Sequence, residues 1–297
     1  MDWKGRRQST NIEDRRGGAK KAGGIGIGSI IIALIVWKVF GISPETTLGV
    51  TQQITQNTQS TPTNETASQA ESRQFVATVL ADTEDVWTPI FRQLGGTYQP
   101  PTLVMFTGRV QSACGSATSA SGPFYCPADQ KVYLDTQFFA DMRRQMGITG
   151  EQAGSTQLTQ TGQAGDFAQA YVIAHEVGHH VQTLLGISNQ VRQAQAKTNQ
   201  TNANQLSVRQ ELQADCFAGL WAHHNHKRTQ FLQAGDIEEA LDAAEKIGDD
   251  YLQHKAHGHT VPDSFTHGTS EQRKRWFYRG FESGDIQQCD TFGVRNI

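Results

Sequence analysis

Apolar and polar residues follow a helical pattern over residues 166–185. The apolar residues recur there every three or four positions, so they form one stripe along the side of a helix. Gly165 or Asp166 is suited to begin the helix, and Gly186 is suited to end it. The pattern predicts an amphipathic helix with one side in a core. The stripe consists of Phe167, Ala170, Tyr171, Ala174, Val177, Val181 and Leu184.

Similar patterns predict further helices and two strands. Residues 74–94 and 237–252 each carry an apolar stripe at helical spacing, and residues 271–281 are aromatic on one side and basic on the other. Residues 102–106 and 131–134 are short apolar runs of the kind that form strands. The sequence therefore predicts an α+β domain that is mainly helical, with a small β-sheet.

Two polar stretches separate these elements. Residues 149–165 are rich in Gly, Gln and Thr, and residues 187–206 are rich in Gln, Asn and Thr. Such compositions are typical of connecting segments. We expect both stretches to be loops, the first leading into the 166–185 helix and the second following it.

The N-terminal part of the chain has a different pattern. Residues 1–21 are polar and basic, with too few apolar residues for a core, which predicts a disordered tail. Residues 22–42 are apolar or glycine except for Ser29 and Lys38, and this length is enough to cross a bilayer. Because basic residues precede it, this segment is predicted to be a single-pass transmembrane anchor with a cytoplasmic N-terminus. A cleaved signal peptide and a buried soluble helix are the alternatives.

A polar spacer follows the apolar segment. Residues 43–70 are rich in Thr, Gln, Ser and Asn and contain few large apolar residues. This composition predicts a flexible linker that holds a folded domain, residues 71–297, away from the membrane. The domain would then lie on the periplasmic or extracellular side.

Charge and cysteine content narrow the class of protein. The 297-residue chain has a formal net charge of −3, which argues against a nucleic-acid-binding protein. Four cysteines in an exported domain predict two disulfides. Cys114 and Cys126 bracket one loop, so we pair them and leave Cys216 with Cys289. Free buried cysteines are the alternative.

The 166–185 helix contains the motif H-E-x-x-H. His175 and His179 are four residues apart, so a helix brings both side chains to one face, where they can bind one Zn²⁺. Glu176 is placed to act on a water molecule as a general base. His180 points away from this face, and we do not expect it to bind the metal. A helix with a few structural histidines is the alternative.

A catalytic zinc site needs a third protein ligand. A further helix, predicted to begin at Ser207 with a capping box that includes Gln210, places Glu211 and Asp215 four residues apart. Their neighbours are largely apolar, so the two acids require partners. Glu211 is the candidate ligand, and Asp215 is suited to accept a hydrogen bond from a ligand histidine. An ordinary pair of solvent-facing acids is the alternative.

These motifs resemble those of known peptidases. H-E-V-G-H followed by E-L-Q-A-D resembles the zinc sites of gluzincins, such as thermolysin-like and HtpX-like peptidases. A narrower resemblance, to the YpfJ-type neutral zinc metallopeptidases of bacteria, rests on residues 113–115, 122–127 and 132–135 together with the zinc helix. It covers roughly residues 75–295 and the N-terminal anchor. It implies a zincin-like fold, a zinc site and a place in the bacterial inner membrane.

The resemblance extends to a stretch near the C-terminus. Residues 267–273 are similar to the H-P-x-x-x-x-R stretch of the HtpX group, with Gly268 where that group has Pro. This implies that His267 faces the zinc cleft and stabilises the oxyanion formed during carbonyl hydrolysis. It implies that Arg273 orients the site or pairs with an acid. A helix-capping loop with a surface histidine is the alternative.

Together these features predict a membrane-anchored zinc metalloendopeptidase that acts on a protein or peptide substrate. One Zn²⁺ per chain, held by His175, His179 and Glu211, would lower the pKa of its water to about 7, and Glu176 would take the proton. One alternative is an envelope scaffold or binding protein that zinc merely stabilises, although such a protein has no use for Glu176. Another is a zinc amidase that acts on cell-wall material.

Overall fold

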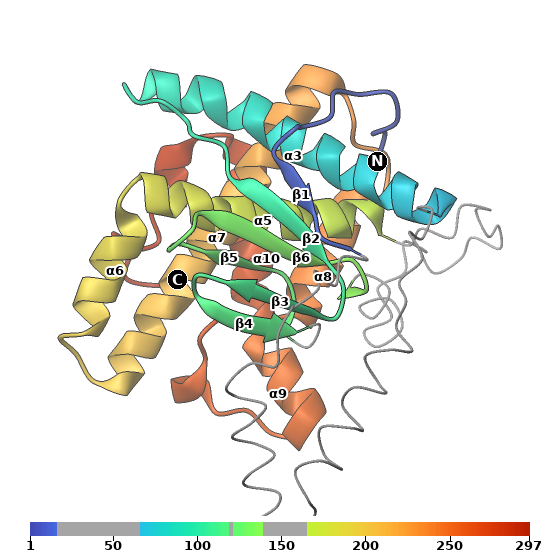
Figure 1. Cartoon of the computed structure of the whole chain (residues 1–297). Helices are drawn as coiled ribbons and strands as arrows, with labels where there is room; N and C mark the ends of the chain where they lie inside the picture. The colour runs from blue at the N-terminus through green and yellow to red at the C-terminus, as the bar shows by residue number, and fades with distance from the viewer. Residues whose placement is uncertain (17–65, 119–120, 139–164) are drawn as a thin grey trace, which may run out of the picture. The chain divides into compact units, whose positions relative to one another are not determined.

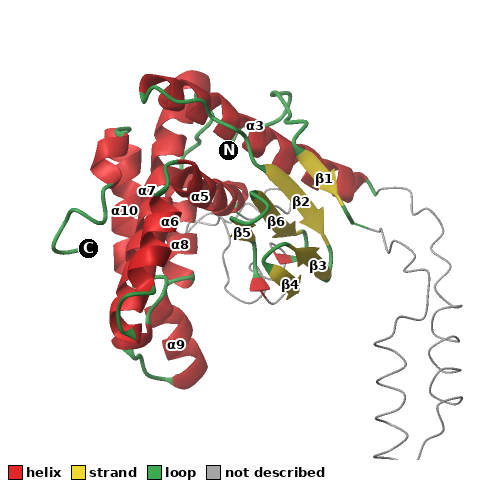
Figure 2. Cartoon of the chain, turned by 60° about the vertical axis from the view of Figure 1, so that its left-hand side comes forward, coloured by secondary structure: helices red, strands yellow, loops and turns green. Residues whose placement is uncertain are grey.

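Helix α5 (Asp166–Leu184) lies between a four-stranded sheet and a layer of helices, as Figures 1 and 2 show. This computed structural model describes residues 1–16, 66–118, 121–138 and 165–297. The helix begins after Gly165, as its sequence predicts. Most of its residues are buried, because the sheet covers one side and the helices cover the other.

The sheet has the order β1-β2-β6-β5, which places β5 at one edge. β1 and β6 both run parallel to β2, and β5 runs antiparallel to β6. The two predicted strands are confirmed as β2 and β6, whose residues are almost all buried, as expected for central strands. The strands are β1 (Ile12–Asp14), β2 (Thr102–Phe106), β5 (Phe124–Cys126) and β6 (Lys131–Asp135), with a separate hairpin of β3 (Arg109–Ser112) and β4 (Gly115–Thr118).

More of the described residues lie in helices than in strands, so the prediction of a mainly helical α+β domain is confirmed. α5 packs on α7, which in turn packs along α10. Besides α5, the described helices are α3 (Ala67–Gln93), α6 (Ile187–Gln195), α7 (Gln200–Thr229), α8 (Asp236–Lys246), α9 (Asp249–His257) and α10 (Ser270–Ser283), with short 3-10 turns η2 (Pro262–Ser264) and η3 (Ile286–Cys289).

Glycines set the distance between α7 and α10. A Cβ atom on Gly280 would lie 1.9 Å from the carbonyl oxygen of Cys216, and a Cβ atom on Gly219 would lie 1.9 Å from that of Phe277. These distances are far inside van der Waals contact. Only glycine therefore allows the two helices to touch here, next to the part of α7 that carries Asp215.

The N-terminal segment is folded rather than disordered. Residues 1–16, which we call the N-terminal arm, form one compact unit with the described residues from 68 to the C-terminus. β1 of the arm pairs with β2, and Trp3 is buried against Phe75 of α3. Arg6 lies 2.6 Å from Asp82 of the same helix. The prediction of a disordered tail is wrong for residues 1–16, because their charged groups find partners on α3 that composition does not reveal.

The arm also bears on the predicted membrane topology. Because β1 is hydrogen-bonded to β2, residues 1–16 belong to the same folded unit as the domain, whereas the predicted topology places a membrane between the two. The predictions for residues 17–21, 22–42, 43–65 and 149–164 concern parts of the chain outside the described residues. Within the described ranges, no helix is long and apolar enough to span a bilayer.

Several predicted boundaries are wrong, each for a local reason. α7 begins at Gln200, capped by Asn199, so Ser207 lies inside the helix rather than at its start. Most of the predicted 187–206 loop is helical, because Val191 of α6 is buried against α7. The linker ends earlier than predicted, since α3 already begins at Ala67.

The predicted 237–252 helix is broken in two. Gly248 separates α8 from α9 with an extended backbone, φ −68° and ψ 144°. A Cβ atom on Gly248 would lie 2.5 Å from the backbone nitrogen of Ser270, so the chain approaches α10 too closely for a continuous helix. The break frees Asp249 at the start of α9 to contact the loop that precedes α10.

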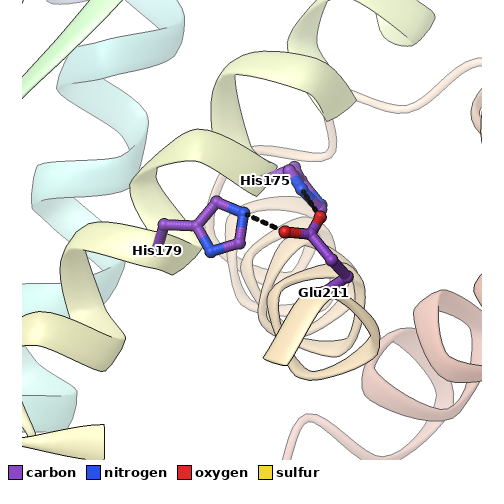
Figure 3. A group of neighbouring side chains, drawn as sticks. All are labelled: His175, His179 and Glu211. Atoms are coloured by element: carbon purple, nitrogen blue, oxygen red, sulfur yellow. Dashed lines mark hydrogen bonds and ion pairs between the residues drawn. The ribbon is translucent and has the colours of Figure 1, made fainter. Parts of the chain in front are cut away.

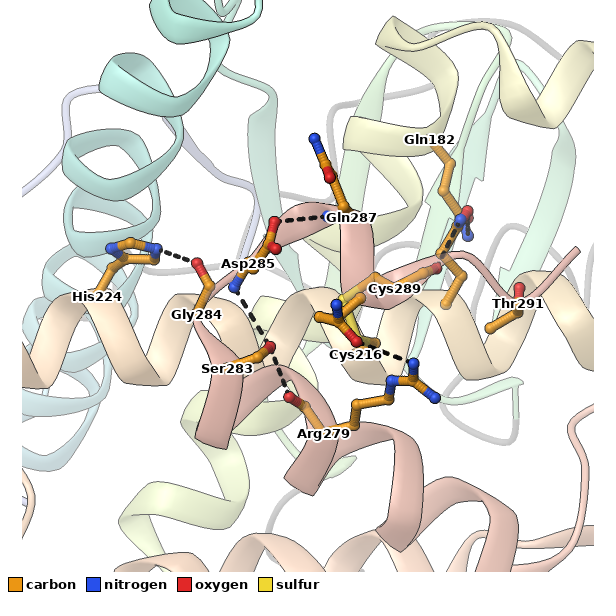
Figure 4. The surroundings of a disulfide bond; sticks show 12 residues. Gln182, Cys216, His224, Arg279, Ser283, Gly284, Asp285, Gln287, Cys289 and Thr291 are labelled. Carbon is orange, nitrogen blue, oxygen red and sulfur yellow. Dashed lines mark hydrogen bonds between the residues drawn. A yellow bond between two sulfur atoms is a disulfide. The ribbon is translucent and has the colours of Figure 1, made fainter. Parts of the chain in front are cut away.

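Both predicted disulfides are confirmed. Cys114 is bonded to Cys126, which ties the β3–β4 hairpin to the edge strand β5. Cys216 is bonded to Cys289, which fixes η3 to the middle of α7, as Figure 4 shows. Each bond therefore fastens a peripheral segment to an element that borders α5.

We predict that Trp3→Ala lowers the free energy of unfolding by about 3–5 kcal/mol, because it empties a buried site against α3. Chemical denaturation followed by circular dichroism measures this. Tyr278→Ala serves as the control, since Tyr278 is 44% exposed. Equal stability of the two variants would show that the arm does not dock as described.

We predict that Gly280→Ala destabilises the fold by more than about 3 kcal/mol, because its methyl group would collide with the backbone of α7. Gly96→Ala is the matched control, since its Cβ atom would make only ordinary contacts at 3.7 Å. Thermal unfolding of the two variants measures the difference. A wild-type melting temperature for Gly280→Ala would contradict the close helix crossing.

Candidate metal centre

Three side chains from α5 and α7 converge at one point. His175 and His179 lie one turn apart on α5, and the carboxylate of Glu211 on α7 faces both rings (Figure 3). His175 Nε2 lies 3.2 Å from Glu211 Oε2, and His179 Nε2 lies 3.4 Å from Glu211 Oε1. Ligands of a tetrahedral zinc ion are about 3.3 Å apart, given bonds of about 2.0–2.1 Å. The spacing of the three groups fits zinc.

The orientation of both rings also fits a cation. His175 Nδ1 is 2.8 Å from Asp215 Oδ1, and His179 Nδ1 is 2.9 Å from Gln182 Oε1. Both partners accept hydrogen bonds, so each ring carries its proton on Nδ1 and turns the Nε2 lone pair toward Glu211. Three lone-pair donors, two nitrogens and one oxygen, thus face one another, and this is the donor set that zinc prefers.

Asp215 connects this centre to α10. Its Oδ2 accepts a hydrogen bond from Arg273 Nε at 2.8 Å, and its Oδ1 accepts one from the Tyr171 hydroxyl at 2.5 Å. Burial opposes ionisation of Asp215, but Arg273 and His175 outweigh it and lower the pKa of Asp215 to about 2. Asp215 is therefore a carboxylate at neutral pH. The structure places both Asp215 and Arg273 beside the ligands rather than among them.

Two glutamines that the sequence analysis did not select hold the other ligand histidine. Gln182 accepts from His179, and its Nε2 donates to Gln213 Oε1 at 3.1 Å. Gln213 Nε2 donates in turn to the carbonyl oxygen of Cys289 at 3.0 Å, within the disulfide-bonded turn of Figure 4. Helical spacing could have indicated Gln182, which is three residues after His179. No local signal indicates Gln213.

His267 borders the same site. Its side chain is 52% exposed, and its Nδ1 lies 3.2 Å from Asp249 Oδ1. Asp249 also accepts hydrogen bonds from the backbone nitrogens of Thr266, His267 and Gly268, so one carboxylate shapes the whole loop. The hydrogen bond with Asp249 raises the pKa of His267. Asp249 has no local signal in the sequence, because its contact with the loop depends on the break between α8 and α9.

The centre opens into a cleft that runs along α5. A cavity of about 390 Å³ on one side is lined by Val172, Glu176 and His267, among others. A second cavity of about 330 Å³ lies on the other side and is lined by Thr183. The two cavities share Tyr125, His179 and Glu211 as lining residues. The two cavities therefore meet at His179 and Glu211, and we call the two together the cleft.

The edge strand β5 forms one wall of this cleft. Phe124 and Tyr125 line the first cavity, and Tyr125 and Pro127 line the second. His180 holds this wall, since its Nδ1 lies 3.1 Å from the Tyr125 hydroxyl and its Nε2 lies 2.6 Å from the carbonyl oxygen of Gln99. His180 thus lies away from the ligands, as expected, and joins α5 to the strand.

A second cluster of acids lies at the start of α5. Asp166, Asp236 and Glu239 come close enough to hold a cation. The amino group of Met1 already lies 2.8 Å from Asp166 and 3.2 Å from Asp236. Burial and the two aspartates raise the pKa of Glu239 to about 7. The acidic cluster therefore binds the amino group of the N-terminal arm, and we do not interpret it as a metal site.

Comparison with known proteins agrees with the geometry. Residues 1–292 match the model of the family described as "Putative neutral zinc metallopeptidase". The chain belongs to this family. It is 48% identical to "Uncharacterized protein YpfJ" of Escherichia coli (strain K12), with 99% of each chain covered. It is 37% identical to "Uncharacterized protein Mb2605" of Mycobacterium bovis, over 77% of this chain and 74% of that protein. No solved structure matches it.

We predict that Gln182→Met weakens zinc binding about 10- to 100-fold, because His179 loses the acceptor that fixes its proton on Nδ1. Competition with a chromophoric chelator measures the affinity. Gln193→Met is the control, since Gln193 is exposed on α6. Equal affinities for the two variants would show that Gln182 does not orient the ligand.

Proposed function

We propose that this protein is a zinc-dependent metalloendopeptidase that holds one zinc ion per chain and hydrolyses peptide bonds. The observation that carries the proposal is the convergence of His175, His179 and Glu211 in an open cleft that Glu176 also lines. When bound, zinc polarises a scissile carbonyl group and lowers the pKa of a water molecule beside it. Membership in a zinc metallopeptidase family supports the same reading.

The protein's own side chains would supply the remaining chemistry. Glu176 accepts a proton from the attacking water and passes it to the leaving amine. His267, with its Nδ1 held by Asp249, presents Nε2 to the carbonyl oxygen as that oxygen becomes negatively charged. The raised pKa of His267 favours the protonated ring, which is the better hydrogen-bond donor.

The shape of the cleft favours an extended chain as the substrate. Val172 and Thr183 line its two cavities and are eleven residues apart on α5, which corresponds to about 16 Å. An extended peptide of about five residues has this length. β5 lies at the sheet edge beside the cleft, so a substrate could add to the sheet as a further strand. Room on both sides of the centre supports cleavage within a chain.

We predict that Glu176→Gln retains one zinc per chain and loses at least about 1,000-fold in casein hydrolysis, because the amide cannot accept the proton. Metal analysis and a proteolysis assay on the same full-length preparation measure both properties. Glu271→Gln is the control, since Glu271 has a highly exposed side chain on α10. Wild-type turnover by Glu176→Gln would contradict the mechanism.

Two other functions would give different results in that assay. A scaffold that zinc merely stabilises would normally close its site with a fourth protein ligand. In the part of the chain that the structure describes, the group at this centre contains three ligand residues and borders a cleft, which favours catalysis. An amidase with a cell-wall substrate would bind zinc, leave casein intact and lose its own activity with Glu176→Gln.

We propose that the apolar residues 22–42 hold the protein at the bacterial inner membrane, with the domain on the periplasmic or extracellular side. The apolar composition of this stretch supports membrane attachment. The two disulfides support an oxidising compartment, because such bonds persist there and are rare in the cytosol. Fractionation of cells that express the full chain tests the attachment.

A further inference from the structure

The two halves of the cleft differ in chemistry. The first cavity contains, beside Ser121 and the charged groups near the centre, four apolar side chains that we call the apolar arm of the cleft: Phe138, Val172, Ile247 and Leu252. On the other side lies what we call the polar arm, which consists of Thr183, Ser188, Arg192, Gln195, Ser207 and Gln210. α5 forms the floor of both arms, so a substrate lying along this helix would meet both.

The apolar arm is built from four separate elements. Val172 lies one turn before Glu176 on α5, Ile247 ends α8, Leu252 lies on α9 and Phe138 follows β6. Leu252 is 37% exposed, which is unusual for a large apolar side chain in this fold. An apolar substrate side chain would remove this surface from water, and that burial favours binding in proportion to the area covered.

The polar arm carries one positive charge. Apart from the candidate ligands, Arg192 is the charged residue among the described residues that line it. Arg192 donates to the amide oxygen of Asn189 at 3.0 Å, and an amide does not neutralise its charge. The neighbouring groups are hydroxyls and amides, such as Ser188 and Gln195. This arm therefore suits a substrate side chain that is acidic or neutral and polar, and it disfavours a basic one.

We propose that the cleft selects substrates by this asymmetry: a large apolar residue on one side of the scissile bond and an acidic or uncharged polar residue on the other. This proposal rests on the proposed function, because it describes substrates of the same site. Leu252 and Arg192 are the residues that determine the two preferences.

The test uses a library of peptides with blocked termini, in which the residues around the centre are varied. Cleavage sites are identified by mass spectrometry. Wild-type protein should favour Phe or Leu over Ala on one side by about tenfold or more. On the other side it should favour Glu over Lys by several-fold. Arg192→Glu should reverse the second preference, and Leu252→Lys should abolish the first.

Matched variants control for general effects of the substitutions. Lys197→Glu makes the same change of charge at an exposed residue just after α6, and Leu94→Lys makes the same change as Leu252→Lys at an exposed residue just after α3. Both should keep the wild-type preferences. Cleavage without any preference, or equal shifts in Arg192→Glu and Lys197→Glu, would overturn the proposal and leave the proposed function intact.

Binding provides a readout that does not depend on cleavage. Peptide hydroxamates that carry Phe or Ala bind zinc directly, and calorimetry on zinc-loaded Glu176→Gln measures their affinities. The Phe compound should bind about tenfold more tightly, and Leu252→Lys in the same background should remove the difference. If wild type cleaves no peptide while this difference is present, the proposed function fails and the selectivity stands. Equal binding of both compounds would overturn the selectivity.

The N-terminal arm carries a separate inference about membrane topology. Arg6 pairs with Asp82, while Ser9 and Asn11 donate to Glu84 at 2.5 and 2.8 Å. Asp82 is 2% exposed and Glu84 is 8% exposed. Removing the arm would leave two buried carboxylates without these partners, which is costly. The N-terminal arm is thus part of the fold, and its strand β1 belongs to the sheet.

We infer that residues 1–16 and the domain occupy the same side of the membrane. This differs from a single-pass anchor with a cytoplasmic N-terminus. It follows from the strand pairing and ion pairs of the arm, because no bilayer can lie between hydrogen-bonded strands.

Thiol labelling in intact and permeabilised spheroplasts tests this inference. All four native cysteines are in disulfides, so Lys4→Cys and Glu271→Cys each introduce one reactive thiol. Both positions are accessible, with side chains 67% and 88% exposed. A membrane-impermeant maleimide should label both from the same side. Labelling of the two thiols from opposite sides would overturn the inference.

Discussion

The carboxylate of Asp215 is the group on which the rest of the site depends. It is fully buried on α7, and it binds Arg273 of α10 together with Tyr171 and His175 of α5. A buried carboxylate without partners would be strongly destabilising, so these three helices must pack in one arrangement. That arrangement also sets the proton on His175 Nδ1 and turns its Nε2 toward Glu211. One ion pair thereby links the core of the fold to the metal centre.

The packing that allows this contact uses small residues. Gly178 lies between the two candidate ligands of α5, and a Cβ atom there would lie 3.1 Å from the carbonyl oxygen of Ala214. Gly280 allows α10 to reach α7 in the same way. The disulfide between Cys216 and Cys289 fixes η3 to α7, next to the glutamines that lead to His179. Both ligand histidines are thus oriented by groups that the helix crossings hold in place.

The same elements shape the surface that a substrate would meet. α5 provides the floor of the cleft and both histidines, while β5 provides a wall that His180 and the bond between Cys114 and Cys126 hold in place. The chemistry at the centre needs only a few residues, and these are common to many zinc hydrolases. Selectivity would therefore come from the residues on either side, among them Arg192 of α6, Ile247 at the end of α8 and Leu252 of α9.

The sequence by itself determined the features that depend on local spacing. A four-residue interval on a helix places His175 with His179 and Glu211 with Asp215, whatever the remaining fold, and the short apolar runs identify β2 and β6. The tertiary structure alone decided which distant groups meet them. Gln213, Asp249 and the N-terminal arm act through partners that lie far away in sequence, and neither periodicity nor composition encodes such pairs. The composition of residues 1–16 predicts disorder, because it does not reveal the buried acids of α3 with which their charged groups pair. Whether a charged group can be buried depends on its partner and not on its own sequence.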